Sequence, residues 1–232
     1  MKKTLSNIDI ISVNCVDPVQ SLKAIQYCQK MFNFNRSILF SSDDLQDDNV
    51  ECKKIDKLTW QQYNDFILSI GQHSNADYIL LIQDDGHIVN ADMWSDEFLN
   101  YDYIGAPWPN EDDWINLQST FPEMREVFKK NRIGNGGFSL RSRKFLNYSN
   151  TFSTCGGVGE DAFLCIRKYD EAIKHGIKFA SFEVAYRFSY ENPCIELGTP
   201  WNAQVAFDTT RHFGWHGKNF TNTYQMMNLK NT

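Results

Sequence analysis

The stretch that decides the fold is residues 78–87, with the sequence YILLIQDDGH. Its first five residues, Tyr78 to Ile82, form a continuous apolar run, which is typical of a strand covered on both faces. Two carboxylates and a glycine follow the run at once. Because the ligands of an open α/β sheet bind outside the carboxyl ends of its strands, we expect the chemistry of this protein near Asp84 and Asp85.

The residues before this stretch alternate between strand and helix patterns. Ile8 to Val13 and Ser37 to Phe40 are predicted strands, and Asp17-Pro18 is predicted to cap and begin the helix between them. Thr59 is predicted to cap a second helix, with Gly71 as its stop signal. Strands alternating with helices predict the α/β class, with a mainly parallel central sheet flanked by helices. The apolar positions expected on the two helices are Val19, Leu22, Ile25, Cys28 and Phe32, then Tyr63, Phe66, Ile67 and Ile70.

The second half of the chain is less regular. Residues 136–140 are predicted to form a strand entered through glycine, and Ser142 to begin a short helix. A helix is predicted from Glu160 to His175, with Gly176 as its stop. The tail, residues 212–217, is expected to be a loop rich in aromatic residues and histidine. With no repeat and no linker, we expect one domain over residues 1–232, with a nucleotide-binding half over about 1–100 and an acceptor-binding half over about 101–232.

Composition excludes several classes of protein. The chain has 232 residues, of which 42% are hydrophobic, so it has enough apolar material for a core. Its 23 basic and 29 acidic residues give a net charge of −6, which argues against a nucleic-acid partner. The six cysteines form no CxxC pair, and the start of the chain lacks a signal-peptide pattern. No apolar run reaches the roughly 18 residues of a membrane span, so we expect a cytoplasmic protein in a reducing compartment.

Two acidic pairs are candidates for chemistry, and each has a plainer explanation. Asp84 and Asp85 can bind a divalent cation with a diphosphate, or they can belong to an ordinary acidic turn. Glu160 and Asp161 follow the glycine-rich residues 156–159, where one carboxylate can act as a general base. Acidic residues are also favoured at any helix N-terminus by the helix dipole.

The remaining candidates are glycines, histidines and aromatic residues. Gly136 and Gly137 can present backbone N–H groups to a substrate or can permit a bulge. His212 and His216 can each bind a metal, although a histidine in an aromatic loop is more often structural. Five rings can stack on sugars but are core material first, namely Tyr103, Trp108, Trp114, Trp201 and Trp215. Phe32, Phe66 and Phe163 are assigned to the core.

The order of these segments resembles the GT-A glycosyltransferases. The matching segments, over about residues 8–217, are Gln83 to Asp85, Tyr101 to Trp108, Gly134 to Arg141, Glu160-Asp161 and Phe213 to His216. More narrowly, they resemble a bacterial and viral GT-A group long catalogued as a domain of unknown function and associated with polysaccharide, lipopolysaccharide or glycan assembly. The resemblance implies a nucleotide-sugar donor, most simply a UDP-sugar, and a glycan or glycolipid acceptor. It also implies Mn²⁺ or Mg²⁺ as cofactor.

The resemblance also implies the roles of individual residues. The family's D-x-D motif aligns with Gln83-Asp84-Asp85, so the first position of the motif departs from the pattern. Asp85 and His216 are then the metal ligands, and Asp161 is the base of an inverting transfer, with Glu160 contacting the acceptor or capping the helix. The donor contacts are assigned to Asn14, Cys15, Asp17, Gln83, Asp84, Gly136 and Gly137.

Two other functions remain open. A non-catalytic carbohydrate-binding protein would keep the fold, and Gln83 in place of aspartate favours it. A nucleotidyltransferase would also use carboxylates and a metal but would attack phosphorus. Peripheral contact with a membrane also stays open.

Overall fold

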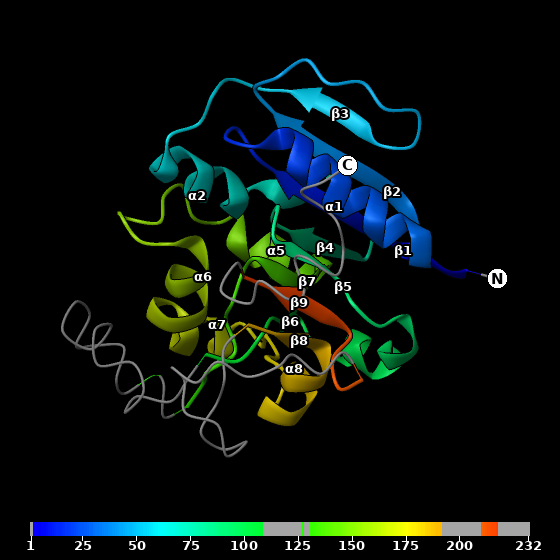
Figure 1. Cartoon of the computed structure of the whole chain (residues 1–232). Coiled ribbons are helices and arrows are strands. Elements are labelled where there is room, and N and C mark those ends of the chain that lie inside the picture. Colours follow the sequence, from blue (N-terminus) through cyan, green and yellow to red (C-terminus); the bar gives the residue numbers. More distant parts are fainter. Residues whose placement is uncertain (1, 109–126, 128–129, 192–209, 218–232) are drawn as a thin grey trace.

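The computed structural model describes residues 2–108, 127, 130–191 and 210–217. Its centre is a six-stranded sheet with the strand order β3-β2-β1-β4-β7-β6 (Figure 1). Neighbouring strands from β3 to β4 are parallel, whereas β7 is antiparallel to both of its neighbours. This arrangement confirms the predicted α/β class with a mainly parallel sheet. The strands are β1 (Lys3–Val13), β2 (Phe32–Ser41), β3 (Glu51–Lys54), β4 (Tyr78–Ile82), β6 (Tyr103–Ile104) and β7 (Phe138–Ser142).

Helices cover both faces of this sheet. Helix α1 (Pro18–Met31) packs on one face, where Ala24, Ile25 and Cys28 join the larger core cluster. The opposite face is covered by α2 (Trp60–Leu68), a 3-10 turn over Ile70–His73 and α5 (Arg143–Ser149), which contribute Ile67, Ile70 and Leu146 to a second cluster. Strand β4 contributes alternate residues to the two clusters, which explains its continuous apolar run.

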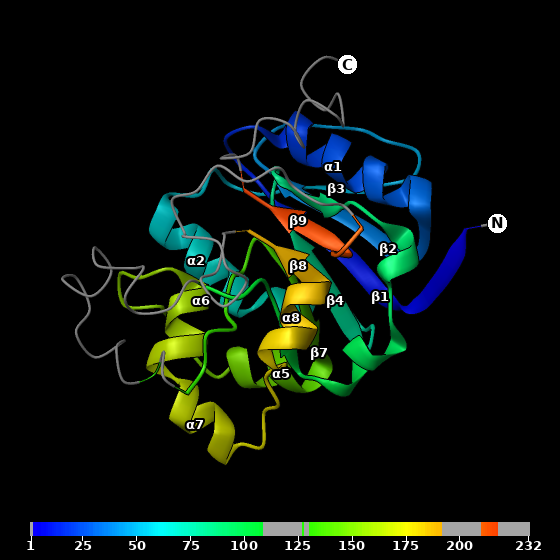
Figure 2. The same ribbon diagram turned by 60° about the horizontal axis from the view of Figure 1, so that its bottom comes forward.

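A small second sheet lies over the first. Its order is β5-β9-β8, with strands β5 (Gly86–Ile88), β8 (Ser189–Tyr190) and β9 (Gly214–His216). Figure 2 shows β8 and β9 in front of β4 and β7. The contact between the sheets is aromatic, since the rings of Phe138 and Phe213 are 5.9 Å apart. The tail is therefore a strand rather than the expected loop, because its backbone pairs with two distant segments.

Three helix boundaries were predicted from local capping signals. The Asp17 side chain accepts a hydrogen bond from the Gln20 N–H, and Pro18 begins α1. Thr59 and Gln62 form a reciprocal capping box at α2. Ser142 accepts the Phe145 N–H at the start of α5. These three predictions are confirmed.

Other local predictions were wrong. Phe32 belongs to β2 and not to α1, because its backbone is already extended, and Val19 on α1 is 47% exposed. Helix α2 ends at Leu68, before Gly71. This glycine instead allows close packing, since a Cβ there would lie 2.8 Å from the Cβ of Leu146. Strand β3 was not predicted at all, because its sequence is short and polar.

The predicted helix over 160–175 is interrupted. It consists of α6 (Glu160–Ala162), a π-helical turn over Phe163–Arg167 and α7 (Tyr169–Lys174). The N–H of Lys168 bonds to the carbonyl of Phe163, five residues back, and this bond replaces the regular pattern. The stop at Gly176 is confirmed by its φ of 72°.

The remaining elements complete the description. They are 3-10 turns over Ala91–Met93 and Asp96–Asn100 and the helix α8 (Phe182–Phe188). The five cysteines within the described residues are all free. Among the helices of this part of the chain, none combines the length and the apolar character that crossing a bilayer requires.

Candidate functional site

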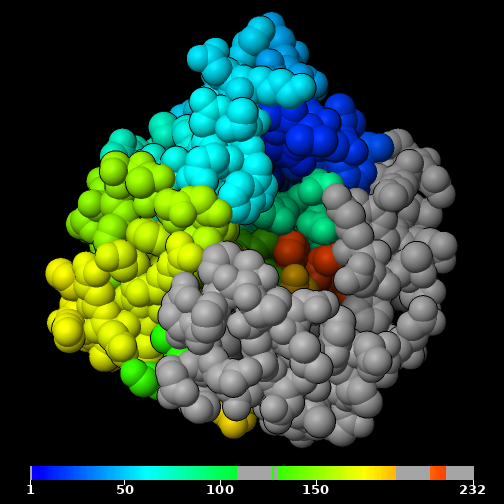
Figure 3. Space-filling view, turned by 90° about the vertical axis from the view of Figure 1, so that its left-hand side faces the viewer, coloured from blue at the N-terminus to red at the C-terminus, as the bar shows by residue number. Residues whose placement is uncertain are grey.

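A cavity of about 520 Å³ opens beyond the carboxyl ends of β1 and β4. Val13, the last residue of β1, lines it together with the loop over residues 14–17, the start of α2, and Gln83 and Asp84 after β4. Figure 3 shows a hollow between the blue N-terminal segment, the cyan segment that contains α2 and the red segment of β9. This cavity therefore lies where ligands of open α/β sheets bind.

The loop after β1 lines this cavity but uses its own side chains to hold its shape. Asn14 Oδ1 accepts the N–H groups of Val16 and Asp17 at 2.8 and 2.9 Å, and Asn14 Nδ2 donates to Ser21 Oγ at 2.9 Å. Asp17 caps α1 through one oxygen, and the Cys15 thiol lies 3.9 Å from the carbonyl of Asp56. These assigned donor contacts thus border the cavity, while much of their polar capacity stabilises the loop.

Two aromatic residues of α2 reach the cavity and were not identified from the sequence as site residues. Trp60 lines the cavity although it is 61% exposed. Tyr63 also lines it, and its hydroxyl accepts a hydrogen bond from Gln83 Nε2 at 3.0 Å. Burial raises the pKa of Tyr63, so its hydroxyl stays protonated at neutral pH. Neither ring had a distinguishing signal in the sequence, because Trp60, Tyr63 and Ile67 follow the i, i+3, i+7 spacing of a single helix face and are typical of core positions.

Gln83, Asp85 and His216 come together at the end of β4. Backbone pairing of Gly86 with His216 brings β9 beside the acidic turn. His216 Nε2 lies 3.3 Å from Asp85 Oδ1 and 3.1 Å from Gln83 Oε1. Two residues predicted as metal ligands are therefore neighbours in space, although 131 positions separate them in the chain.

The glycine segment before β7 packs directly against this group. The Gln83 N–H donates to the Gly137 carbonyl at 2.8 Å. A Cβ on Gly137 would lie 1.9 Å from His216 Nε2, so only glycine leaves room for the imidazole. The adjacent Gly136 N–H donates to Asp161 Oδ2 at 3.1 Å. Gly136 and Gly137 thus connect the histidine to the predicted base.

Glu160 and Asp161 have different surroundings. Both oxygens of Glu160 are bound by the guanidinium of Arg141, at 2.8 and 3.1 Å, and the two side chains are 6% and 1% exposed. The Glu160 N–H is held by Asn64 Oδ1 of α2 at 2.8 Å. Among the described residues, no cation pairs with Asp161, and its hydrogen bonds come from the N–H groups of Gly136 and Ala162. Arg141 and Asn64 were not identified from the sequence, because a polar residue whose partner lies far along the chain carries no local signal.

The environments of Asp161 and His216 shift their pKa values upward. Burial and the negative charge of Glu160 raise the pKa of Asp161 to about 7, against the two N–H groups that lower it. Burial alone would lower the pKa of His216. Its hydrogen bonds to Asp85 and Glu191 outweigh burial and raise that pKa to about 10. At neutral pH Asp161 is therefore close to its midpoint, and a cation bound at His216 Nε2 would have to displace the second proton that the two carboxylates favour on the ring.

The other predicted candidates fall into the core or outside the described residues. His212 is 2% exposed, its Nδ1 lies 2.6 Å from the Tyr186 carbonyl, and its ring packs against those of Tyr186 and Tyr190. Tyr103, Trp108 and Trp215 are buried. Trp114 and Trp201 lie outside the described residues. Phe32 and Phe163 are buried and Phe66 is partly buried, as expected for core residues.

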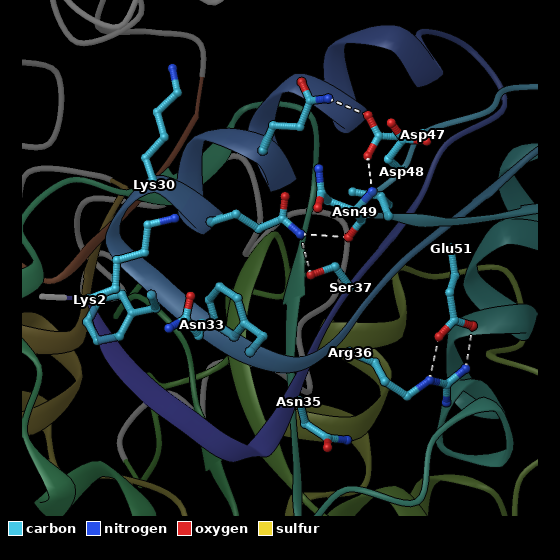
Figure 4. A pocket seen from close by; sticks show the side chains of 15 residues that line it. Lys2, Lys30, Asn33, Asn35, Arg36, Ser37, Asp47, Asp48, Asn49 and Glu51 are labelled. Atoms are coloured by element: carbon cyan, nitrogen blue, oxygen red, sulfur yellow. Dashed lines mark hydrogen bonds and ion pairs between the residues drawn. The ribbon is translucent and has the colours of Figure 1, made fainter.

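A second depression, of about 800 Å³, lies at the other end of the sheet, beside the beginning of β2 (Figure 4). Its polar side chains bind one another, as in the bidentate pair of Arg36 with Glu51. Gln29 likewise donates to Ser37 Oγ at 2.9 Å. This depression contains none of the predicted site residues.

The donor set at the end of β4 suits a hard divalent cation. Mg²⁺ usually takes one or two carboxylates and completes its shell with water and substrate phosphates. Asp85 offers a carboxylate, Gln83 an amide oxygen and His216 a ring nitrogen, and this nitrogen lies 3.3 and 3.1 Å from the two oxygens. In the described part of the chain, no three His, Cys, Asp or Glu side chains are arranged to hold a metal by themselves. The residues therefore fit a cation that shares its coordination with a diphosphate.

The fold is that of the GT-A glycosyltransferases. The bifunctional glycosyltransferase WbbM in its apo form is similar with a TM-score of 0.60 and 12% identity, over 98% of this chain and 50% of that chain. The galactosyltransferase LgtC in complex with donor and acceptor sugar analogues is similar with a TM-score of 0.50 and 10% identity, over 94% of both chains. A glycosyltransferase involved in the glycosylation of the major capsid of PBCV-1 has a TM-score of 0.50 and 10% identity, over 97% of this chain and 99% of that chain.

Comparison of the amino-acid sequence identifies one family. No curated protein matches the chain. The family described as "Protein of unknown function (DUF5672)" matches residues 49–206, which is more than half of the chain and includes Asp85, Gly137 and Asp161. The chain, with its GT-A fold, therefore belongs to the DUF5672 family.

Proposed function

We propose that this protein is a glycosyltransferase that moves a sugar from a nucleoside-diphosphate sugar, most simply a UDP-sugar, to a hydroxyl of a glycan or glycolipid. One observation carries the proposal. The adjacent residues Gly136 and Gly137 lie between the Asp85–His216 pair and the Asp161 carboxylate, so the two groups are neighbours beyond the end of β4, next to Gln83 of the cavity. Transfer of a sugar needs a cationic site for the departing diphosphate and a base for the incoming hydroxyl.

The donor side is assigned to the first half of the chain, about residues 1–100. Trp60 offers an exposed ring for a nucleobase, and Tyr63 offers a protonated hydroxyl within the same cavity. Asp85 and His216 would hold Mn²⁺ or Mg²⁺, with Gln83 Oε1 beside them. When bound, the cation supplies positive charge that stabilises the departing diphosphate.

The acceptor side is assigned to residues 101–232, with Asp161 as the base of an inverting transfer. Its pKa of about 7 leaves a large fraction ionised at neutral pH and still able to take a proton. Glu160 is a weaker candidate for the base, because Arg141 binds both of its oxygens. We assign Glu160 to fixing the start of α6, so that Asp161 faces the acceptor hydroxyl.

A second candidate function is carbohydrate binding without catalysis. Gln83 favours it, because an amide stands where the GT-A motif has a carboxylate. The third possibility, nucleotidyl transfer, has no specific support from the geometry of the cleft. The three functions differ in their products.

The test is product analysis with UDP-glucose, UDP-galactose and UDP-N-acetylglucosamine, each with and without Mn²⁺. Free UDP is expected, whereas pyrophosphate would indicate nucleotidyl transfer. Neither product, together with donor binding in a thermal-shift assay, would favour the binding protein. The Asp85→Asn variant is expected to lose Mn²⁺-dependent UDP binding while keeping its fold. His216→Ala should weaken that binding more than His212→Ala, and the reverse order would remove His216 from the site.

A further inference from the structure

Glu191 is a carboxylate beside His216. It follows β8, and its Oε1 lies 3.2 Å from His216 Nδ1. The two side chains are 20% and 13% exposed. The other oxygen, Oε2, is buried and has no hydrogen-bond partner among the described residues. The carboxylate is therefore turned into the protein and is not a surface ion pair.

The two nitrogens of His216 face different partners. A carboxylate only accepts hydrogen bonds, so Nδ1 must carry the proton that Glu191 receives. Because the two ring nitrogens point in divergent directions, this bond turns Nε2 toward Asp85 and Gln83. Gly137 closes the side of the ring, since any side chain there would overlap Nε2. The imidazole is thus held from two sides and presents one nitrogen to the candidate cation site.

From this geometry we propose that Glu191 is the positioning residue of His216, fixing Nε2 toward the cation and the donor diphosphate. The role of this contact in donor binding rests on the proposed function, whereas the contact between Glu191 and His216 does not. A carboxylate or carbonyl that binds the far nitrogen of a metal-binding histidine fixes both its orientation and its tautomer, and loss of such a partner typically costs about 10- to 100-fold in metal affinity. Glu191 acts through the position of its acceptor atom rather than through its charge.

Three variants separate position from charge. Glu191→Ala removes both the acceptor and the charge. Glu191→Gln keeps an acceptor oxygen in nearly the same place and removes only the charge. The double variant Gln83→Glu/Glu191→Ala restores a carboxylate, but on the Nε2 side of the ring. The control is Glu183→Ala, which removes an exposed carboxylate from the first turn of α8.

Calorimetry of UDP binding at saturating Mn²⁺ gives the first readout. Glu191→Ala is expected to weaken binding about 10- to 100-fold, by analogy with other histidine-orienting groups. Glu191→Gln should stay within about threefold of the wild type, since its amide oxygen accepts the same hydrogen bond. The double variant should remain as weak as Glu191→Ala. Recovery in the double variant, or a Glu191→Gln as weak as Glu191→Ala, would show that charge alone matters and would overturn the proposal.

The second readout needs neither metal nor donor. In protein labelled with ¹⁵N-histidine, the Nδ1–H signal of His216 is identified by its loss in His216→Ala. It should persist in Glu191→Gln and Glu183→Ala and should disappear through fast exchange in Glu191→Ala. A signal that persists in Glu191→Ala would refute the positioning role. If the wild type binds no UDP, the proposed function fails, and this spectrum still decides whether Glu191 holds the ring.

Discussion

Removal of the Arg141 guanidinium should destabilise the protein strongly, because it leaves the Glu160 carboxylate buried without a counter-charge. The pair is bidentate, with distances of 2.8 and 3.1 Å, and the side chains are 1% and 6% exposed. Water therefore cannot replace the lost partner. Arg141→Met keeps much of the side-chain volume and removes the charge.

The magnitude follows from this burial. Removal of one partner of a buried ion pair costs about 3–5 kcal/mol in the free energy of unfolding. For a domain of this size, each kcal/mol lowers Tm by about 2–4 °C, so Arg141→Met should lower Tm by about 10 °C. The double variant Arg141→Met/Glu160→Gln removes the unpaired charge. It should be only about 1–3 kcal/mol less stable than the wild type, which is the cost of one buried polar group without a partner.

The assay is urea unfolding followed by tryptophan fluorescence, with both single variants and the double variant in one thermodynamic cycle. The double variant is expected to be more stable than Arg141→Met. The control is Arg187→Met, which removes an ion pair with Glu97 whose side chains are 41% and 42% exposed. A partly exposed pair of this kind contributes about 1 kcal/mol or less. Equal losses for Arg141→Met and Arg187→Met, or strictly additive losses in the cycle, would refute the reasoning.

Three further predictions concern the cleft. Gly137→Ala should weaken Mn²⁺-dependent UDP binding at least about tenfold, because its Cβ would lie 1.9 Å from His216 Nε2; calorimetry with unchanged affinity would mean that the ring is not needed in this position. Asp161→Asn should bind UDP normally and transfer sugar at least about a hundredfold more slowly. In the wild type, kcat/KM should fall about tenfold per unit as the pH drops below about 7, where Asp161 becomes protonated, and this limb should vanish in the variant; a limb that persists would assign the base elsewhere. Trp60→Ala should weaken UDP binding about 5- to 150-fold, the equivalent of about 1–3 kcal/mol of ring stacking. The free energy of unfolding in urea should change by less than about 0.5 kcal/mol, because the residue is 61% exposed. A loss of stability without a loss of affinity would make Trp60 structural.

Elements with local signals could be predicted from the amino-acid sequence. The caps at Asp17, Thr59 and Ser142 lie within three residues of the N–H groups they bind. The five consecutive apolar residues from Tyr78 to Ile82 predict a buried strand without reference to any other segment. Asp85 was placed after its strand by the same reasoning. Such features form from short-range hydrogen bonds and side-chain periodicity, so they can be predicted before any tertiary contact is known.

Only the tertiary structure decided which of these groups meet. The bond from Gln83 to His216 spans 133 positions, and the bond from Asn64 to Glu160 spans 96. Arg141 and Glu191 have no sequence pattern that distinguishes them from surface charges, and their partners are brought close by β7, β8 and β9. Strand pairing and close packing against glycine depend on segments far apart in the chain. A backbone N–H can pair with any carbonyl, and the space beside Gly137 can accept any side chain that fits, so neither specifies its partner. For this reason Asp85, Asp161 and His216 could be proposed as site residues from the sequence, but the residues that hold them in place could not.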